Sequence, residues 1–334
     1  MTAIALDAMG GDDAPAATVR GAIEAAREGI EVALVGERSV LEAELARSGG
    51  TPPGVRIEQA SDVIEMGEHA AIEARRRRDS SIYVGLSLVR RGEADAFVSA
   101  GNTGAVFATA LVVLGRLRGI ERPALGALLP VPAGPTLLLD AGANAECRPS
   151  HLVQFAHLGS AYMATVVGVP NPRVGLLNIG EEPTKGTPVL IETHEELAKS
   201  DLRFVGNVEG RDVFRGAVDV VVADGFTGNV MLKLAEGLIE MIFTEMRSVA
   251  SSSLRTRLGG ALLRPALREM STRLDYRKYG AAPLLGVEGP VFVAHGRSDA
   301  GTIANAIRTA AGAVERGMIA ALAAVPTERL GSRD

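Results

Sequence analysis

The stretch AFVSAGNTGAVFATALVVLG, at residues 96–115, contains no charged side chain over 20 positions. A run of this length could cross a membrane as a helix. However, SAGNTGA at residues 99–105 interrupts the run with the polar and glycine residues of a turn. We therefore predict a buried strand over 96–98, a turn, and a helix over 104–117. The other long uncharged run, 123–139, contains four prolines and cannot be one helix, so we predict no membrane span.

On both sides of this stretch, short β-branched runs alternate with helical patterns. The predicted strands cover residues 4–6, 31–35, 55–58, 136–139, 174–177, 203–205 and 218–222, and the predicted helices include 14–28, 80–91, 150–166, 187–199 and 229–250. Such alternation is typical of βαβ units. The fold class predicted is therefore α/β, a largely parallel α/β/α sandwich. We expect one catalytic unit over 1–325, with two lobes sharing a continuous sheet, a helical excursion at about 246–275, and a tail over 326–334.

The composition excludes several classes of protein. The chain has 334 residues, of which 47% are hydrophobic and 22% charged, as in an ordinary globular protein. Its formal net charge of −5 argues against nucleic acid as a partner. The single cysteine, Cys147, excludes an internal disulfide, and the N-terminus lacks the pattern of a signal peptide, so we expect a cytoplasmic protein. The chain contains no P-loop motif, no G-x-G-x-x-G, no G-x-S-x-G and no metal-ligand spacing of histidines.

Five predicted strands are each followed by glycine together with small polar or charged residues. Ligands of parallel α/β proteins bind outside the carboxyl ends of the strands, so these corners are the candidate site. Any one of them could simply cap a helix, but five together indicate a binding site. The corners are Asp7–Asp12, Ser99–Gly104, Asp140–Asn144, Asn178–Gly186 and Asp224–Asn229.

Two of these corners are typical of an anion cradle. Gly-Asn-Thr-Gly at 101–104 opens a helix, whose free N–H groups and positive dipole end favour an anion, and Thr-Gly-Asn at 227–229 nearly repeats it. The chain has only four lysines, and Lys185 and Lys233 lie beside such corners. Cys147 is more simply explained as a partly buried core residue than as a nucleophile.

Residues 246–268 contain five arginines and no acidic residue. Leu254, Leu258 and Leu262 are spaced four apart, on one helical face. The simpler explanation is a solvated helical excursion or an oligomer arm. The alternative is an amphipathic segment that rests on anionic lipid.

Seven motifs, in order along the chain, resemble those of the acyl-acyl-carrier-protein:phosphate acyltransferases, the PlsX family. They are DAMGGD at 7–12, SAGNTGA at 99–105, D-x-GAN at 140–144, NIGEE-x-x-KG at 178–186, DGFTGN-x-x-LK at 224–233, DY-x-x-YGAAPLLGV-x-G at 275–289 and HG-x-S at 295–298. One small departure is Ala281-Ala282, where the family usually has glycine first. The resemblance implies a fold similar to isopropylmalate dehydrogenase and phosphotransacetylase, with a helical dimer arm.

The same resemblance implies the reaction and the partners. A fatty acyl group would pass from acyl carrier protein to inorganic phosphate, giving acyl phosphate for phospholipid synthesis. The protein would be a homodimer in peripheral contact with an anionic membrane and with a downstream acyltransferase. No cofactor and no metal would be required.

Roles for individual residues are assigned here from their positions in the loops. Phosphate binding is assigned to Gly101, Asn102, Thr103, Gly104, Thr227, Gly228 and Asn229, and catalysis to Lys185, Asn229 and Asn102. Asp7 and Asp224 would orient these donors, and His295 is a reserve candidate for protonating the leaving thiolate. Contact with membrane or carrier protein is assigned to Leu254, Arg255, Arg257, Leu258, Leu262, Arg264 and Arg268.

Three alternative functions remain open from the sequence. A phosphotransacetylase acting on short-chain acyl-CoA would share the fold and the phosphate cradle. A decarboxylating dehydrogenase of the related fold would need clustered aspartates for a metal, and no Asp-x-x-x-Asp cluster is visible. A non-enzymatic membrane scaffold built around residues 246–268 would leave the five polar strand ends without a role.

Overall fold

A computed structural model describes residues 2–65, 67–68, 70–274, 278 and 280–325. The strands are β1 (Ala3–Asp7), β2 (Glu31–Gly36), β3 (Val55–Gln59), β4 (Ala96–Ser99), β5 (Ala124–Val131), β6 (Gly134–Leu139), β7 (Val174–Leu177), β8 (Phe204–Val208), β9 (Val220–Val222), β10 (Ala281–Leu285) and β11 (Val291–Ala294). They form a sheet in the order β3-β2-β1-β4-β11-β10-β5-β6-β9-β7-β8. The predicted tail over 326–334 lies outside the described residues.

The helices alternate with these strands along most of the chain, as predicted. They are α1 (Ala16–Arg27), α2 (Arg38–Arg47), α3 (Ala70–Arg76), α4 (Ser81–Arg90), α5 (Thr103–Val113), α6 (Pro149–Tyr162) with its π-helical continuation (Met163–Val167), α7 (Pro188–Ala198), α8 (Gly210–Val213), α9 (Gly225–Ser251), α10 (Leu254–Leu274), α11 (Ala300–Glu315) and α12 (Met318–Ala323). Within the described residues no helix is long and apolar enough to cross a membrane.

The sheet consists of two parallel groups joined by antiparallel strands. Strands β3, β2, β1, β4 and β11 are parallel neighbours, and so are β6, β9, β7 and β8. Between them, β10 pairs antiparallel with β11 and β5, and β5 pairs antiparallel with β6. Strands β5, β10 and β11 were not predicted. A proline lies inside β5 (Pro130) and inside β10 (Pro283), β11 is only four residues long, and the pairing of β10 with β5 joins segments far apart in the sequence.

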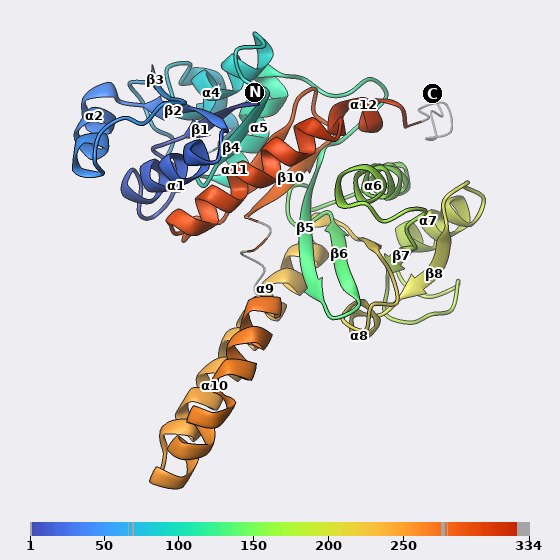
Figure 1. The fold of residues 1–334 in the computed structure, drawn as a ribbon. Coiled ribbons are helices and arrows are strands. Elements are labelled where there is room, and N and C mark those ends of the chain that lie inside the picture. Colours follow the sequence, from blue (N-terminus) through green and yellow to red (C-terminus); the bar gives the residue numbers. More distant parts are fainter. Residues whose placement is uncertain (1, 66, 69, 275–277, 279, 326–334) are drawn as a thin grey trace.

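Alternate residues of each strand face opposite layers of helices. On β1, Ile4 and Leu6 pack with α1 and α11, whereas Ala5 packs with Leu86 of α4 and Val106 of α5. Helices therefore cover both faces of the sheet, as Figure 1 shows. This is the α/β sandwich predicted from the sequence.

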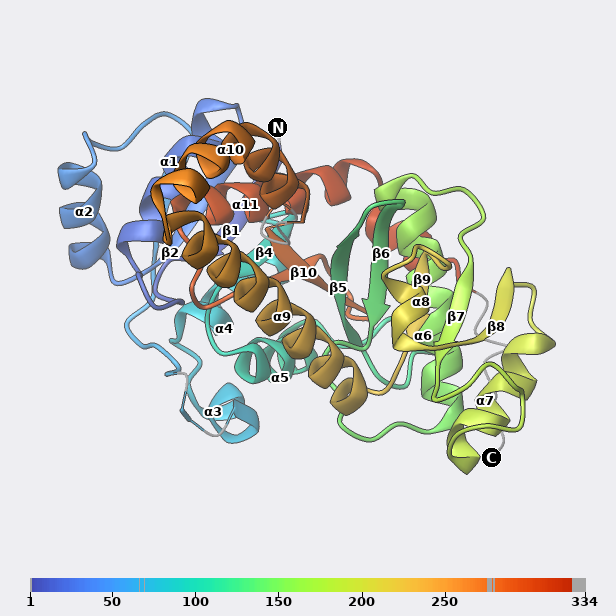
Figure 2. The ribbon, with the colours of Figure 1, turned by 90° about the horizontal axis from the view of Figure 1, so that it is seen from below.

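Helices α9 and α10 form a long hairpin, here called the arm, that projects from the body (Figures 1 and 2). A Cβ on Gly260 would stand 3.1 Å from Cβ of Ala250, so glycine lets the two helices approach closely. Helix α9 begins at Gly225, four residues before the predicted start, and α10 runs unbroken through Gly259, Gly260 and Pro265. The first turns of α9 pack on the sheet through Met231 and Leu232, and the rest of the arm projects away from it (Figure 1).

Candidate active site

The ends of β1 and β4 lie side by side, because the two strands are parallel neighbours. Asp7 ends β1 and is buried; Oδ2 accepts a hydrogen bond from Ser99 Oγ at 2.6 Å. Ser99 Oγ in turn accepts from the N–H of Gly101 at 3.0 Å. Burial raises the pKa of Asp7, and the hydrogen bonds from Ser99 and Met9 oppose that rise. The carboxyl group thus holds the turn that leads into α5.

Helix α5 presents an open N-terminus at this turn. Asn102 is its N-cap: Oδ1 accepts from the N–H of Ala105 at 3.1 Å, and Nδ2 donates to the carbonyl of Glu65 at 3.2 Å. Among the interactions of the described residues, no acceptor contacts the exposed N–H groups of Thr103 and Gly104. These two amides, with the helix dipole behind them, are available to an anion.

Asp140 organises the matching corner at the end of β6. Oδ1 accepts from the N–H groups of Leu125, Gly142 and Ala143 at 3.0–3.1 Å. Oδ2 accepts from the backbone N–H and the side-chain amide of Asn144 at 2.7 and 2.9 Å. Burial raises the pKa of Asp140, and these donors oppose it. This corner was predicted, but Asp140 was not singled out in it. Four of its five donors belong to Gly142, Ala143 and Asn144, which follow it closely in the sequence, and only Leu125 is brought to it by the fold.

The N-terminus of α9 differs from that of α5, although their sequences are similar. Asp224 is its N-cap and accepts from both the N–H and the hydroxyl of Thr227, at 2.8 and 2.7 Å. The N–H of Gly225 donates to the carbonyl of Asn144 at 2.7 Å. These bonds leave the amides of Gly225 and Thr227 occupied by the chain itself. The α5 end is therefore the more open of the two predicted cradles.

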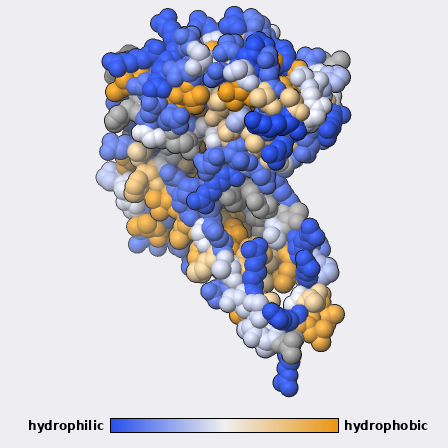
Figure 3. All heavy atoms as spheres, turned by 90° about the vertical axis from the view of Figure 1, so that its left-hand side faces the viewer, coloured by the Kyte–Doolittle hydropathy of each residue, from blue (hydrophilic) through white to orange (hydrophobic). Residues whose placement is uncertain are grey.

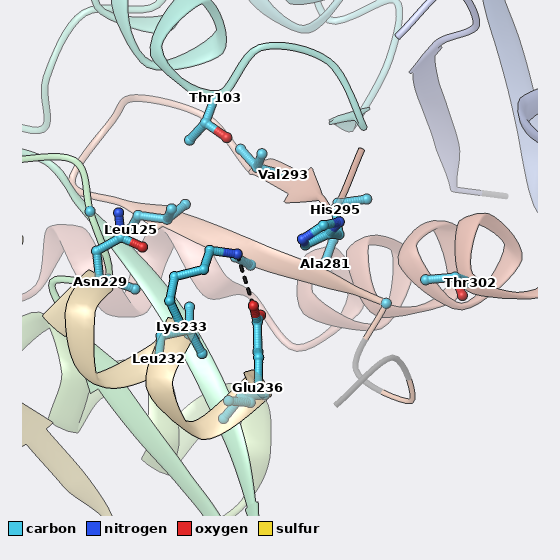
Figure 4. A pocket seen from close by; sticks show the side chains of 17 residues that line it. Thr103, Leu125, Asn229, Leu232, Lys233, Glu236, Ala281, Val293, His295 and Thr302 are labelled. Atoms are coloured by element: carbon cyan, nitrogen blue, oxygen red, sulfur yellow. Dashed lines mark hydrogen bonds and ion pairs between the residues drawn. The ribbon is translucent and has the colours of Figure 1, made fainter. Parts of the chain in front are cut away.

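A cavity of about 310 Å³, here called the central pocket, lies between the two parallel groups of strands. Figure 4 shows Lys233 and Asn229 entering it from α9, with Thr103 of α5 opposite and His295 to one side. His295 Nδ1 accepts the N–H of Arg297 at 3.2 Å, so the neutral ring carries its proton on Nε2. The other residues that line the central pocket include Leu125, Ala127, Leu128, Ala141, Gly142, Leu232, Glu236, Ala281, Val293 and Thr302.

The cation in this pocket is Lys233. Its Nζ lies 2.8 Å from Oε2 of Glu236, whose side chain is only 18% exposed. Lys185, to which the sequence analysis assigned charge neutralisation, lines neither of the two cavities described here; its carbonyl accepts from Asn178 Nδ2 at 3.0 Å. The sequence did contain a signal for Lys233, since it lies four residues after Asn229 and so shares its helical face.

A second cavity, of about 1,210 Å³, lies against α9 and is here called the outer cavity. Cys147 lines it, with Sγ 3.8 Å from the carbonyl of Asn144. Burial, with the nearby carboxylates of Asp140 and Asp224, raises the pKa of the thiol to about 12. The thiol is therefore protonated at neutral pH, which makes Cys147 a poor nucleophile.

The predicted site residues thus fall into groups. The structure brings Thr103, Asn229 and His295 into the central pocket, and places Asp224 and Thr227 on the outer cavity. Asp7 and Asn102 hold the loops beside the pocket without lining it. The predicted contact residues Arg255, Arg257, Leu258, Leu262, Arg264 and Arg268 lie on α10, in the arm, and α10 begins at Leu254.

Comparisons with known proteins decide the family. A family model described as "Fatty acid synthesis protein" matches residues 2–321. The chain is 49% identical to a phosphate acyltransferase of Moorella thermoacetica over 97% of this chain and 95% of that one. It is 53% identical to one of Thermus thermophilus over 95% and 96% of the two chains. The chain belongs to the phosphate acyltransferase family.

Solved structures agree with this phosphate acyltransferase fold. A phosphotransacetylase from Streptococcus pyogenes superposes with a TM-score of 0.63 at 20% identity, over 94% of both chains. A 4-hydroxythreonine-4-phosphate dehydrogenase from Klebsiella pneumoniae superposes with a TM-score of 0.55 at 14% identity, over 93% of this chain and 98% of that one. The fold class and the family resemblance inferred from the sequence are therefore confirmed, and the protein is an acyltransferase.

Proposed function

We propose that this phosphate acyltransferase moves a fatty acyl group from acyl carrier protein to inorganic phosphate and releases acyl phosphate. The observation that supports this most directly is the central pocket. There the open N-terminus of α5 faces an amide, Asn229, and a cation, Lys233. Helix N–H groups, an amide and an ammonium are the donors that a phosphate dianion requires.

The reaction requires that the phosphate and the thioester be held in position, and it needs no nucleophile from the protein. A phosphate oxygen attacks the thioester carbonyl carbon, and the carbonyl electron pair moves onto its oxygen. When the tetrahedral intermediate collapses, the C=O bond re-forms and the C–S bond breaks. The thiolate then takes the proton that hydrogen phosphate carried, and His295 Nε2 is the candidate group through which that proton passes. The acyl phosphate and the carrier thiol leave, so atoms and charge balance.

Each residue has a distinct part in this proposal. The amides of Thr103 and Gly104 bind phosphate, and Asn229 and Lys233 stabilise the negative charge that grows on the oxyanion. Asn102 keeps the amides of Thr103 and Gly104 in place, because it is the N-cap of the helix that begins with them. Asp7 and Asp224 orient the loops rather than act as bases, because a carboxylate beside phosphate would repel it.

The experiment is mass spectrometry of the protein incubated with palmitoyl-acyl carrier protein, with and without phosphate. We expect loss of the acyl group from the carrier only when phosphate is present, with acyl phosphate trapped as its hydroxamate. Turnover of acetyl-CoA with phosphate, but not of the acyl carrier, would instead favour the phosphotransacetylase alternative. That alternative is kept because phosphotransacetylases share the fold. Turnover of neither substrate would contradict both.

We further propose that the protein works in the cytoplasm as a homodimer and touches an anionic membrane through the arm. Leu258 and Leu262 on α10 are 68% and 78% exposed, and Figure 3 shows hydrophobic surface along the arm and near its end. The interspersed arginines suit anionic headgroups. A long-chain acyl phosphate could pass from here to a membrane acyltransferase.

Leu258→Glu is expected to reduce binding to vesicles of anionic lipid by at least about tenfold, because it puts a charge where apolar side chains would enter the membrane. Co-sedimentation with the vesicles measures this. Turnover with soluble carrier should remain near that of the unaltered protein. If affinity for the carrier falls while vesicle binding persists, the arm docks the carrier instead.

A further inference from the structure

Four consecutive arginines stand at residues 75–78, where α3 ends. A run of like charges usually forms a solvated face. Arg75, Arg76 and Arg78 do so: their side chains are exposed and make no ion pair or hydrogen bond within the part of the chain that the structure describes. Arg77 differs from these three, because its side chain is only 28% exposed and is surrounded by acceptors.

The guanidinium of Arg77 joins the two sides of the segment that carries α3. Its Nε donates to Oε2 of Glu73 at 2.9 Å, and its Nη2 donates to Oε1 of Glu68 at 2.6 Å. Its Nη1 donates to the carbonyl of Val63 at 2.8 Å and to Oδ1 of Asp62 at 3.3 Å. Three of these four partners precede α3 and Arg77 follows it, so one side chain closes the segment on itself.

The same segment lies against the candidate phosphate site. Helix α3 packs on α5 (Figure 2). The carbonyl of Glu65 accepts a hydrogen bond from Nδ2 of Asn102 at 3.2 Å. Asn102 is the N-cap of α5, and its Oδ1 accepts from the N–H of Ala105 at 3.1 Å. The side chain of Asn102 therefore bonds at one end to the α3 segment and at the other to the helix whose first amides are assigned to phosphate.

The carboxylate of Glu68 connects Arg77 to Glu65. Its Oε1 accepts from Arg77, and its Oε2 accepts from the backbone N–H of Glu65 at 2.9 Å. A continuous chain of hydrogen bonds thus runs from Arg77 through Glu68 and the backbone of Glu65 to Asn102, at the start of α5. Glu73 also pairs with Arg77, but it is not part of this chain.

We propose that Arg77 is a positioning residue for phosphate. Through Glu68 and the backbone of Glu65, it fixes the side chain of Asn102 and with it the first two amides of α5. The proposal rests on the proposed function, which assigns those amides to phosphate. Two N–H groups hold an anion well only while they point to the same place, and a displacement of about 1 Å in such a site can cost about 10² in rate.

The charge of Arg77 could affect phosphate without any positioning, and the test must separate the two effects. Glu68→Gln and Glu73→Gln do so, because each removes one negative charge and one ion pair with Arg77. By charge alone, both changes would strengthen phosphate binding or leave it unaltered. Only Glu68→Gln breaks the chain of bonds, since glutamine puts an NH2 donor where one of the two carboxylate oxygens now accepts.

We expect the KM for phosphate to rise at least about tenfold in Glu68→Gln and to stay within about threefold in Glu73→Gln. The kcat at saturating phosphate should change less than about threefold in both, because amides that hold phosphate throughout the reaction contribute to KM and not to kcat. Circular dichroism checks the folding of both variants. Equal KM values for phosphate in the two variants would overturn the proposal.

Arg77→Gln should raise the KM for phosphate as Glu68→Gln does. Arg78→Gln is its matched control, because it removes the same charge from the exposed neighbour. A KM that rises in Arg77→Gln but not in Glu68→Gln would show that Arg77 acts by its charge, and would overturn the proposal as well.

A double variant tests whether the effect passes through Asn102. Asn102→Ala removes the side chain that bonds to Glu65. In that background, adding Glu68→Gln should change the KM for phosphate by less than about twofold, because the link that it breaks is already absent. Additive effects of the two changes would show that Glu68 reaches the site by another route, and the proposal would be wrong.

Hydrogen exchange separates this proposal from the proposed function, because it needs neither phosphate nor acyl carrier. The N–H of Ala105, which Asn102 accepts, should exchange at least about fivefold faster in Glu68→Gln than in Glu73→Gln, measured by mass spectrometry of overlapping peptides. If it does but the unaltered protein transfers no acyl group to phosphate, the link to α5 holds and the proposed reaction fails. If transfer occurs and neither exchange nor KM differs between the two variants, the positioning role is wrong.

Discussion

Gly228→Ala is expected to lower the free energy of unfolding by about 3 kcal/mol or more and turnover by at least about a hundredfold. A Cβ at position 228 would stand 2.0 Å from the carbonyl oxygen of Asp140. That carbonyl cannot easily move, because the Asp140 carboxylate is tied to its loop by five hydrogen bonds. Helix α9 must shift instead, and it carries Asn229 and Lys233 with it.

Denaturant unfolding and steady-state turnover measure the two effects of Gly228→Ala. Gly237→Ala is the matched control, since it lies on the same helix with no atom within 4 Å of the added carbon. Alanine is the better helix former by up to about 1 kcal/mol, so this control should be stable and active. Wild-type stability and turnover in Gly228→Ala would show that the close approach of α9 to the Asp140 loop is unimportant.

Lys233→Met is expected to reduce kcat/KM for phosphate by about 10²–10³-fold, the usual cost of losing one donor to a developing oxyanion. The change also leaves the Glu236 carboxylate, now 2.8 Å from the Lys233 ammonium, unpaired beside the pocket. A bare carboxylate there would repel phosphate further. The KM for the acyl carrier should change little, because the lost group acts on phosphate and the oxyanion.

Lys185→Met is the comparison for Lys233→Met, since it removes the same charge from a lysine that lines neither cavity. Initial rates at varied phosphate concentration should stay within about threefold of the unaltered protein. A large loss of turnover in Lys185→Met together with a small loss in Lys233→Met would show that Lys185 neutralises the charge, as was predicted from the sequence.

Several features of the site were predictable because they depend on local rules. Parallel neighbouring strands end at the same edge of a sheet, so Asp7 and Ser99 were expected to lie near one another. The N-cap at Asn102 follows from a residue type that accepts hydrogen bonds from the first turn of a helix. Asp224 is of the same kind, but the helix after it was predicted to start only at residue 229. The seven motifs also gave the resemblance to the PlsX family, which the comparisons confirm.

Other features of the fold and the site could not be predicted from the local sequence pattern. The pairing of β10 with β5 and of β11 with β4 joins segments far apart in the sequence, for example Leu284 with Leu125. Two similar helix starts, at 101–104 and 227–229, became different because Asn144 and Asp224 occupy the amides of the second.

The sequence by itself therefore determined the alternation of strands and helices, the corners that hold the site and the family. Each of these depends on residues that are neighbours along the chain. Only the tertiary structure decided which lysine enters the central pocket, which helix N-terminus stays open, and that α9 lines two cavities. Those outcomes depend on segments that are far apart in the sequence, such as those of Thr103 and Lys233, which line one pocket, or of Asn144 and Gly225, which share a hydrogen bond. No local pattern encodes how such segments come together.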